Sequence, residues 1–235
     1  SLILGLGPST AKIAFDGGAD DLTLQGARFG IGVILIWIFI RFKGLKIAPL
    51  FSIWRRILVI GIATAIGSFG YMGSTRYIDV PLASLIFFSY PLLIGVIAFV
   101  FRTEHMTARK TMAVLTGFAG VGMVIGFAAI TPSLIGISLA FMAAVMVAIV
   151  FVISVPALHL TSAPVVLFSN SVVASGVYGL CTIIAPAFDY YPSLPATTAG
   201  WTGLGAHVFI MIIGIGLLLA AIGRIGAVRA TVVNN

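Results

Sequence analysis

Long apolar runs separated by short polar gaps make up most of this chain. We count eight runs, and all but a shorter first one approach the length that crosses about 30 Å of hydrocarbon. They extend approximately over Leu2–Phe15, Leu24–Ile40, Ile57–Thr75, Leu82–Phe101, Met112–Ile130, Leu134–Val155, Val165–Ala187 and Leu204–Ile222. Because the runs are continuously apolar and do not alternate with polar residues, they predict transmembrane α-helices and not the strands of a barrel.

The first run is short, and no initiator methionine precedes it, so we expect the chain to begin part-way through its first span. A signal peptide is not indicated. The segment from Ser1 to Phe15 lacks a basic start and a small-residue cleavage pattern followed by a soluble domain.

Polar side chains form a stripe along the third run. The stripe consists of Thr64, Ser68, Tyr71 and Thr75, and its spacings of four, three and four residues place all of them on one helical face. A polar stripe in lipid must face protein or water, and hydrogen bonding between helices is one interpretation. A similar stripe in the seventh run consists of Ser171, Ser175, Tyr178 and Thr182. There we favour helix packing.

A proline interrupts the fourth run near its middle. Pro91 has no N–H and disturbs the backbone carbonyl of Phe87, so the helix should be broken at this point. Such a break either exposes backbone dipoles to a substrate or is an ordinary membrane-helix proline whose neighbours satisfy the freed group. Ser89 and Tyr90 beside it favour a cavity. Phe87 and Phe88 could line the cavity or face lipid.

Composition identifies the class of protein. Hydrophobic residues make up 60% of the chain and charged residues 8%, and the mean hydropathy is +1.21, values far outside the range of soluble domains. The single cysteine, Cys181, excludes an intrachain disulfide. With only three scattered histidines there is no zinc-ligand spacing, so we expect no metal and no cofactor.

The cations are distributed unevenly over the gaps. Ten of the thirteen Lys and Arg residues lie in alternate gaps, which we therefore expect to be cytoplasmic. They are Arg41, Lys43, Lys46, Arg55, Arg56, Arg102, Arg109, Lys110, Arg224 and Arg229. The opposite side carries Asp16, Asp20, Asp21, Asp79 and Asp189, with Arg76 as its only cation. Topology thus explains the net charge of +7, and nucleic acid is not expected as a partner.

Two cations lie inside or at the edge of apolar runs. Lys12 is one helical turn from Asp16, so the two can pair, and the long Lys12 side chain can reach the interface. Arg28 lies roughly 9 Å inside the second run. Its side chain could form a structural ion pair with Asp16, Asp20 or Asp21, the interpretation we favour here, or it could recognise a substrate carboxylate or form a gate.

A weak internal repeat spans 147 positions. The segment Ile78–Ile86 aligns with Ile225–Val233, and Gly67 aligns with Gly214 in the same register. The charge pattern puts Ile78 and Ile225 on opposite sides of the membrane, as an inverted duplication after five spans requires. We therefore expect a first repeat over residues 1–130 and a second over 131–235. The second lacks its last two helices.

The residues of this chain resemble the EamA-type carriers of the drug/metabolite transporter superfamily. The clearest match runs from Ser74 to Gly126. It contains Tyr77–Ala83, Ser89-Tyr90-Pro91, Glu104 and Gly120, whereas Thr103 and Ala113 stand where glycine is common. Arg28 matches an Arg often seen early in the second helix, and Ala227–Val233 resembles the return in the second repeat. The resemblance implies an all-α membrane fold of two inverted five-helix repeats, with about eight of ten helices present, and it places the third run at a central cavity.

The resemblance also implies function. We expect a secondary transporter that moves small metabolites, such as amino acids or related solutes, by alternating access, in the bacterial inner membrane. A membrane enzyme is not indicated, because the only acidic cluster lies in a hydrophilic outer turn, but a structural or channel-like protein stays an alternative. We expect a small-molecule substrate and the lipid bilayer as partners. The GxxxG spacing of Gly122 and Gly126 could serve helix packing within the monomer or the formation of a homodimer. The candidate substrate-binding residues are Arg28, Thr64, Ser68, Tyr71, Thr75, Ser89, Tyr90 and Pro91.

Overall fold

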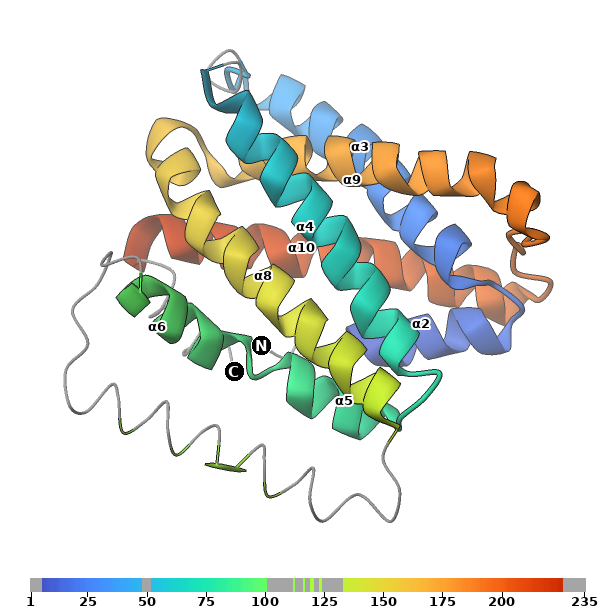
Figure 1. Cartoon of the computed structure of the whole chain (residues 1–235). Coiled ribbons are helices and arrows are strands. Elements are labelled where there is room, and N and C mark those ends of the chain that lie inside the picture. Colours follow the sequence, from blue (N-terminus) through green and yellow to red (C-terminus); the bar gives the residue numbers. More distant parts are fainter. Residues whose placement is uncertain are drawn as a thin grey trace.

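The computed structural model describes residues 6–47, 52–100, 112, 116, 119–120, 123 and 133–225. The long helices lie side by side in one bundle (Figure 1). They are α2 (Gly7–Asp16), α3 (Asp21–Phe42), α4 (Trp54–Ser74), α5 (Val80–Phe87), α6 (Tyr90–Val100), α8 (Leu134–Leu160), α9 (Ala163–Ile184), the 3₁₀ turn η2 (Ala185–Phe188) and α10 (Thr198–Ile225). No strand occurs among these residues, and the all-α prediction is confirmed.

Six helical stretches of the described chain are long and apolar enough to cross a membrane. Each overlaps one of the predicted runs, and α5 together with α6 counts as one stretch, Val80–Ile97. The described part of the first predicted run forms the ten-residue helix α2. Most of the fifth run lies outside the described residues, as do Glu104, the Gly122 and Gly126 pair, and the segment Ala227–Val233.

Local sequence signals set several helix starts. The Asp20 carboxylate accepts a hydrogen bond from the Thr23 N–H at 2.7 Å and caps α3, satisfying one of the free donors at its first turn. Ser133 caps α8 in the same way. Pro81 and Pro164 stand in the first turns of α5 and α9, where the missing N–H costs no helical hydrogen bond.

The predicted break in the fourth run is present. Helix α5 ends at Phe87 and α6 begins at Tyr90, one residue before Pro91. The Ser89 N–H donates to the Ile86 carbonyl in a tight turn between the two helices. Because the missing N–H of Pro91 prevents the regular ladder from continuing, the two half-helices meet in the middle of the bundle.

The two largest of three apolar clusters lie toward opposite ends of the bundle. One contains Ile40, Ile53 and Ile222, which adjoin gaps rich in Lys and Arg. The other contains Ala19 and Ile78, which adjoin the Asp-bearing turns. We call these the basic and acidic ends. The structure therefore separates the charges along the bundle axis in the way the loop pattern predicts.

The acidic end is tied together by two segments far apart in sequence. The Ala196 N–H donates to the Gly17 carbonyl at 2.8 Å, and the Ser193 hydroxyl donates to the Gly18 carbonyl at 2.9 Å. The Tyr190 hydroxyl donates to the Asp20 carboxylate at 2.8 Å. Burial, and then this bond to a carboxylate, raise the pKa of Tyr190 above its ordinary value. The loop before α10 thus holds the turn between α2 and α3.

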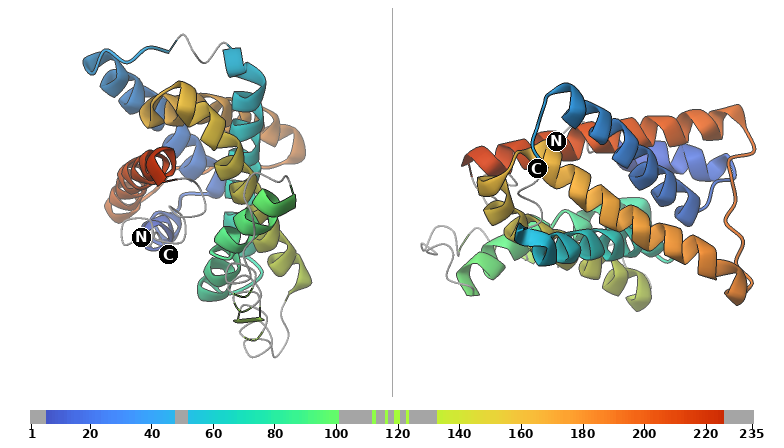
Figure 2. Two further views of the ribbon diagram at one scale, coloured as in Figure 1. Left: turned by 90° about the vertical axis from the view of Figure 1, so that its left-hand side faces the viewer. Right: turned by 90° about the horizontal axis from the view of Figure 1, so that it is seen from above.

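The contacts between helices are symmetric with respect to the two halves of the sequence. Helix α4 packs along α8 while α10 packs along α2, α4 contacts α9 while α10 contacts α3, and α3 and α9 pack on each other (Figure 2). Exchanging α2, α3 and α4 with α8, α9 and α10 reproduces the same set of pairs. An inverted duplication should produce this pattern. The boundary between the two repeats at residue 130 stays a prediction.

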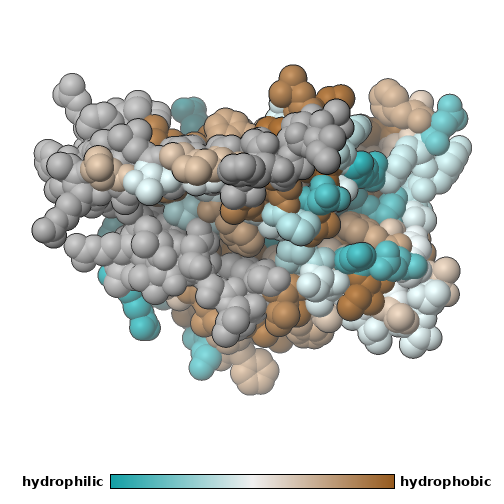
Figure 3. Space-filling view, turned by 90° about the horizontal axis from the view of Figure 1, so that it is seen from below, coloured by the Kyte–Doolittle hydropathy of each residue, from teal (hydrophilic) through white to brown (hydrophobic). Residues whose placement is uncertain are grey.

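The outer surface is apolar over the membrane-crossing helices. Large hydrophobic side chains are exposed on every long helix, among them Ile34, Phe69, Leu180 and Leu217. On the face in Figure 3, the described surface shows broad apolar areas between hydrophilic residues. In water such a surface would aggregate, whereas in a bilayer it contacts lipid. The chain is a multi-pass membrane protein.

Candidate functional site

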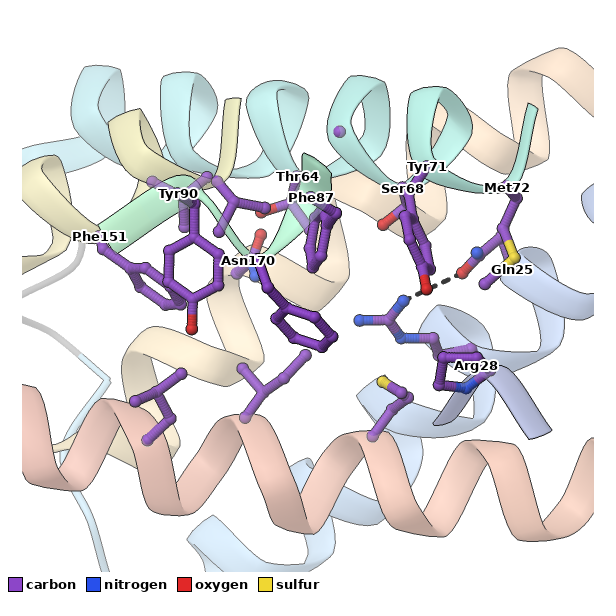
Figure 4. A pocket seen from close by; sticks show the side chains of 18 of the residues that line it. Gln25, Arg28, Thr64, Ser68, Tyr71, Met72, Phe87, Tyr90, Phe151 and Asn170 are labelled. Atoms are coloured by element: carbon purple, nitrogen blue, oxygen red, sulfur yellow. Dashed lines mark hydrogen bonds between the residues drawn. The ribbon is translucent and has the colours of Figure 1, made fainter. Parts of the chain in front are cut away.

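A cavity of about 140 Å³ lies inside the bundle, between the two apolar clusters. Every described helix contributes to its wall (Figure 4). The lining residues are Pro8, Gln25, Arg28, Thr64, Gly67, Ser68, Tyr71, Met72, Phe87, Phe88, Tyr90, Val147, Val150, Phe151, Asn170, His207, Met211, Ile215 and Leu218. Helices from both halves of the sequence therefore enclose one internal space.

Arg28 from α3 supplies the positive charge of the cavity. Its Nη1 donates a hydrogen bond to Gln25 Oε1 at 3.1 Å, one turn earlier on the same helix (Figure 4). The Gln25 amide nitrogen interacts with Asp21 but outside hydrogen-bond geometry. Gln25 thus stands between the cation and the nearest carboxylate and holds Arg28 in place.

Within the described chain Arg28 forms no ion pair with Asp16, Asp20 or Asp21. Asp20 is engaged by Thr23 and Tyr190, and Asp21 does not line the cavity. The structural ion pair that we favoured from the sequence is therefore not formed at contact distance, although Arg28 and Asp21 attract each other electrostatically. The guanidinium retains further N–H donors beyond the one used by Gln25, since arginine has five.

Four polar side-chain atoms of the lining lack hydrogen-bond partners among the described residues. They are Gln25 Nε2, Thr64 Oγ1, Asn170 Oδ1 and His207 Nε2. Asn170 is 5% exposed and His207 0%. An unsatisfied buried polar group costs about 1–3 kcal/mol, so several such groups around one cavity favour a polar ligand there.

Aromatic rings cover the part of the cavity away from Arg28. Phe87 contacts Tyr71 with ring centroids 4.5 Å apart and Tyr90 at 5.8 Å, and Tyr90 contacts Phe151 at 5.5 Å. In Figure 4, Tyr90 and Phe151 lie at one end and Arg28 and Gln25 at the other. The cavity therefore has a charged pole and an aromatic pole.

The α4 stripe divides in the structure. Thr64, Ser68 and Tyr71 line the cavity. Thr75 does not, and its hydroxyl donates to the Met72 carbonyl of the preceding turn at 2.7 Å. Tyr71 also has a structural role, because its hydroxyl lies 2.8 Å from Ser84 Oγ on α5.

Of the three candidate residues at the helix break, one lines the cavity. Tyr90 lines the cavity, but Ser89 and Pro91 do not. The Ser89 hydroxyl donates to the Ile86 carbonyl at 2.6 Å. Ser89 and Pro91 therefore shape the turn that brings Phe87, Phe88 and Tyr90 to the cavity.

The two remaining sequence features lie outside the cavity. On α9, the Tyr178 hydroxyl donates to the Ala65 carbonyl of α4 at 3.1 Å, a bond of the helix-packing kind expected for that stripe. Lys12 and Asp16 are both exposed and form no ion pair with each other.

Gln25, Asn170 and His207 are cavity residues that the sequence reasoning missed. Each is an uncharged polar residue in an apolar run, and polar residues inside membranes face protein or water. That signal could have identified all three. Among the described residues, no group of three or more His, Cys, Asp or Glu side chains could hold a metal ion.

Comparisons with known proteins agree with this architecture. The profile of the EamA-like transporter family matches residues 1–126, more than half of the chain. A solved structure described only as "Crystal structure of protein" superposes with a TM-score of 0.65 at 21% identity, covering 99% of this chain and 85% of that one. At this identity the likeness concerns the fold alone. A search of curated proteins gave no match.

Proposed function

The chain belongs to the EamA-like transporter family, and we propose that it carries small carboxylate-bearing metabolites across the membrane by alternating access. As a member of that family it is a membrane transporter of the drug/metabolite transporter superfamily and not an enzyme by family type. We place it in the bacterial inner membrane with its basic end in the cytoplasm, following the distribution of Lys and Arg.

Arg28 is the observation that carries the proposal. It is a cation in an internal cavity of a membrane protein, with no carboxylate of the described chain paired to it. A charge at that depth is costly without a partner. A substrate carboxylate would supply the missing partner, because the planar guanidinium can donate two parallel hydrogen bonds to it.

The architecture supports alternating access. The cavity lies between helices of the first half and helices of the second half of the sequence. In carriers built from inverted repeats, rocking of one half against the other opens the central site to each side in turn. The break between α5 and α6 at Phe88-Ser89 lies at the cavity wall, where the two half-helices can move relative to each other.

The test is transport by the purified protein in proteoliposomes, against a panel of amino acids and organic anions. We expect saturable flux of at least one carboxylate. Arg28→Gln should reduce its affinity at least about 30-fold, since removing one partner of a buried charge pair costs about 2–5 kcal/mol. The folded yield should be unchanged.

Arg28→Lys is the matched control, because it keeps the charge but loses the two-pronged geometry. We expect an affinity between those of the wild type and Arg28→Gln. If Arg28→Gln instead lost folded protein while the surviving fraction transported normally, Arg28 would be structural. If no member of the panel were transported, the carrier proposal would fail.

A further inference from the structure

The hydrogen bonds around Arg28 and His207 specify what kind of carboxylate the cavity fits, an argument that rests on the proposed function. The two residues come from α3 and α10, line the same cavity and interact electrostatically. His207 is fully buried. Its only partners are on α2, where Nδ1 lies 3.1 Å from the Gly7 carbonyl oxygen and 3.4 Å from Thr10 Oγ1.

These partners fix the tautomer of His207. A backbone carbonyl only accepts hydrogen bonds, so the Nδ1 atom facing Gly7 must carry the proton. The Thr10 hydroxyl donates to the Gly7 carbonyl at 2.9 Å, so toward the imidazole it acts as an acceptor as well. In the neutral ring, Nε2 is then a hydrogen-bond acceptor. It has no partner in the described chain.

Gln25 holds Arg28 at the charged pole of the cavity. The Arg28 N–H can only donate, so the Gln25 atom that meets it is the amide oxygen. Gln25 is 0% exposed, which leaves its side chain little freedom to move. The remaining N–H groups of Arg28 are donors for an anion, and His207 Nε2 is the acceptor beside them.

We propose that the preferred substrates are 2-hydroxy monocarboxylates with an apolar side chain. Arg28 binds the carboxylate, the neighbouring hydroxyl donates to His207 Nε2, and the side chain occupies the aromatic pole formed by Phe87, Tyr90 and Phe151. A 2-amino acid fits less well. Among the described residues no Asp or Glu lines the cavity, so its ammonium group adds a second positive charge near Arg28 without a described carboxylate to balance it.

Three probes that differ at one position test this inference. 3-Phenyllactate carries a hydroxyl next to the carboxylate, 3-phenylpropionate carries hydrogen there, and phenylalanine carries an ammonium group. Their affinities are measured by calorimetry on the purified protein and by competition in proteoliposome transport. We expect phenyllactate to bind at least about tenfold more tightly than each of the other two, since an unpaired buried acceptor penalises the analogue that cannot satisfy it.

Two variants assign the preference to His207. His207→Phe keeps a ring but removes the acceptor, so the ratio of phenyllactate to phenylpropionate affinity should fall to about one. His207→Gln keeps an acceptor and should retain most of the ratio. If His207→Phe does not fold, the wild-type ratios and His207→Gln still decide the matter.

The outcomes separate this inference from the proposed function. Equal binding of phenyllactate and phenylpropionate, both dependent on Arg28, would overturn the hydroxyl preference and leave a carboxylate carrier. Tighter binding of phenylalanine would overturn it in favour of amino acids. If transport of the wider panel succeeds and none of the three probes binds, the substrate class is wrong but the carrier proposal stands.

Discussion

Helices α4 and α10 occupy matching places in the predicted repeat, yet they present opposite chemistry to the same cavity. The 147-residue offset that aligns Gly67 with Gly214 also pairs three cavity residues of α4 with three of α10. The pairs are Thr64 with Met211, Ser68 with Ile215, and Tyr71 with Leu218. The α4 members carry hydroxyl groups, and the α10 members are entirely apolar.

This difference shows how two helices in matching places can hold an asymmetric substrate. The helix arrangement places the corresponding face of each helix at the cavity, while the side chains on those faces differ. Ser68 and Tyr71 of the polar α4 face lie near Arg28, and Thr64 lies farther along the helix (Figure 4). A metabolite with a charged head and an apolar body can then bind in one orientation, because the α4 face and His207 offer hydrogen bonds whereas Met211, Ile215 and Leu218 of α10 do not.

The largest expected effect comes from disturbing the close packing of α4 on α8 behind the polar wall. A Cβ on Gly70 would lie 2.9 Å from the Leu139 carbonyl oxygen of α8, whereas one on Gly205 of α10 would meet nothing within 4 Å. We expect Gly70→Leu to destabilise the fold by about 3 kcal/mol through overpacking, and Gly205→Leu to be close to neutral. Thermal unfolding in detergent checks both. Equal melting temperatures would contradict the close α4–α8 packing.

A change on the apolar wall should have an intermediate effect. Ile215→Asn places an amide where the structure has only apolar groups on α10, and a buried amide without a partner costs about 1–3 kcal/mol. Affinity for a substrate with an apolar body should fall about tenfold. Ile215→Val is the control and should stay within about twofold. An Asn variant with unchanged affinity would show that the apolar body binds elsewhere.

The smallest effect concerns two hydroxyls on α4 itself. Tyr71→Phe removes the contact with Ser84 and should lower the free energy of unfolding by about 1 kcal/mol. The transport rate should fall a few-fold. The Thr75 hydroxyl bonds only to its own helix, away from the cavity. Thr75→Val should therefore leave transport within about twofold. An equal loss of transport in Tyr71→Phe and Thr75→Val would contradict the placement of Tyr71 inside the cavity and Thr75 outside it.

Much of the fold follows from local sequence, and the deviations have local causes. Helix α10 begins at Thr198, six residues before the predicted Leu204, because the small residues before Leu204 join the helix without being strongly apolar. Helix α8 continues through Pro156 to Leu160, although proline usually marks a helix end. Membrane helices tolerate proline where neighbours satisfy the backbone.

The sequence predicted Arg28, Tyr90 and the periodic part of the site. Thr64, Ser68 and Tyr71 recur at helical spacing, so the sequence identifies their shared face. Asn170 and His207 lie outside the polar stripes, and their placement at the same cavity as Arg28 depends on how α9 and α10 pack on α3, which no local pattern specifies. The partner of Arg28 was wrongly anticipated for the same reason. Capping and the Tyr190 contact engage Asp20 elsewhere.

The central claim is that substrate occupies the cavity between the α4 and α10 walls. The most direct measurement is thiol labelling in proteoliposomes, with Cys181→Ala as the background and a single cysteine at Ser68 or, on the opposite wall, at Ile215. A water-soluble thiol reagent should label both positions, and a transported carboxylate should slow both reactions in proportion to its occupancy. Labelling that substrate does not slow at either position, or complete inaccessibility of both, would contradict the account.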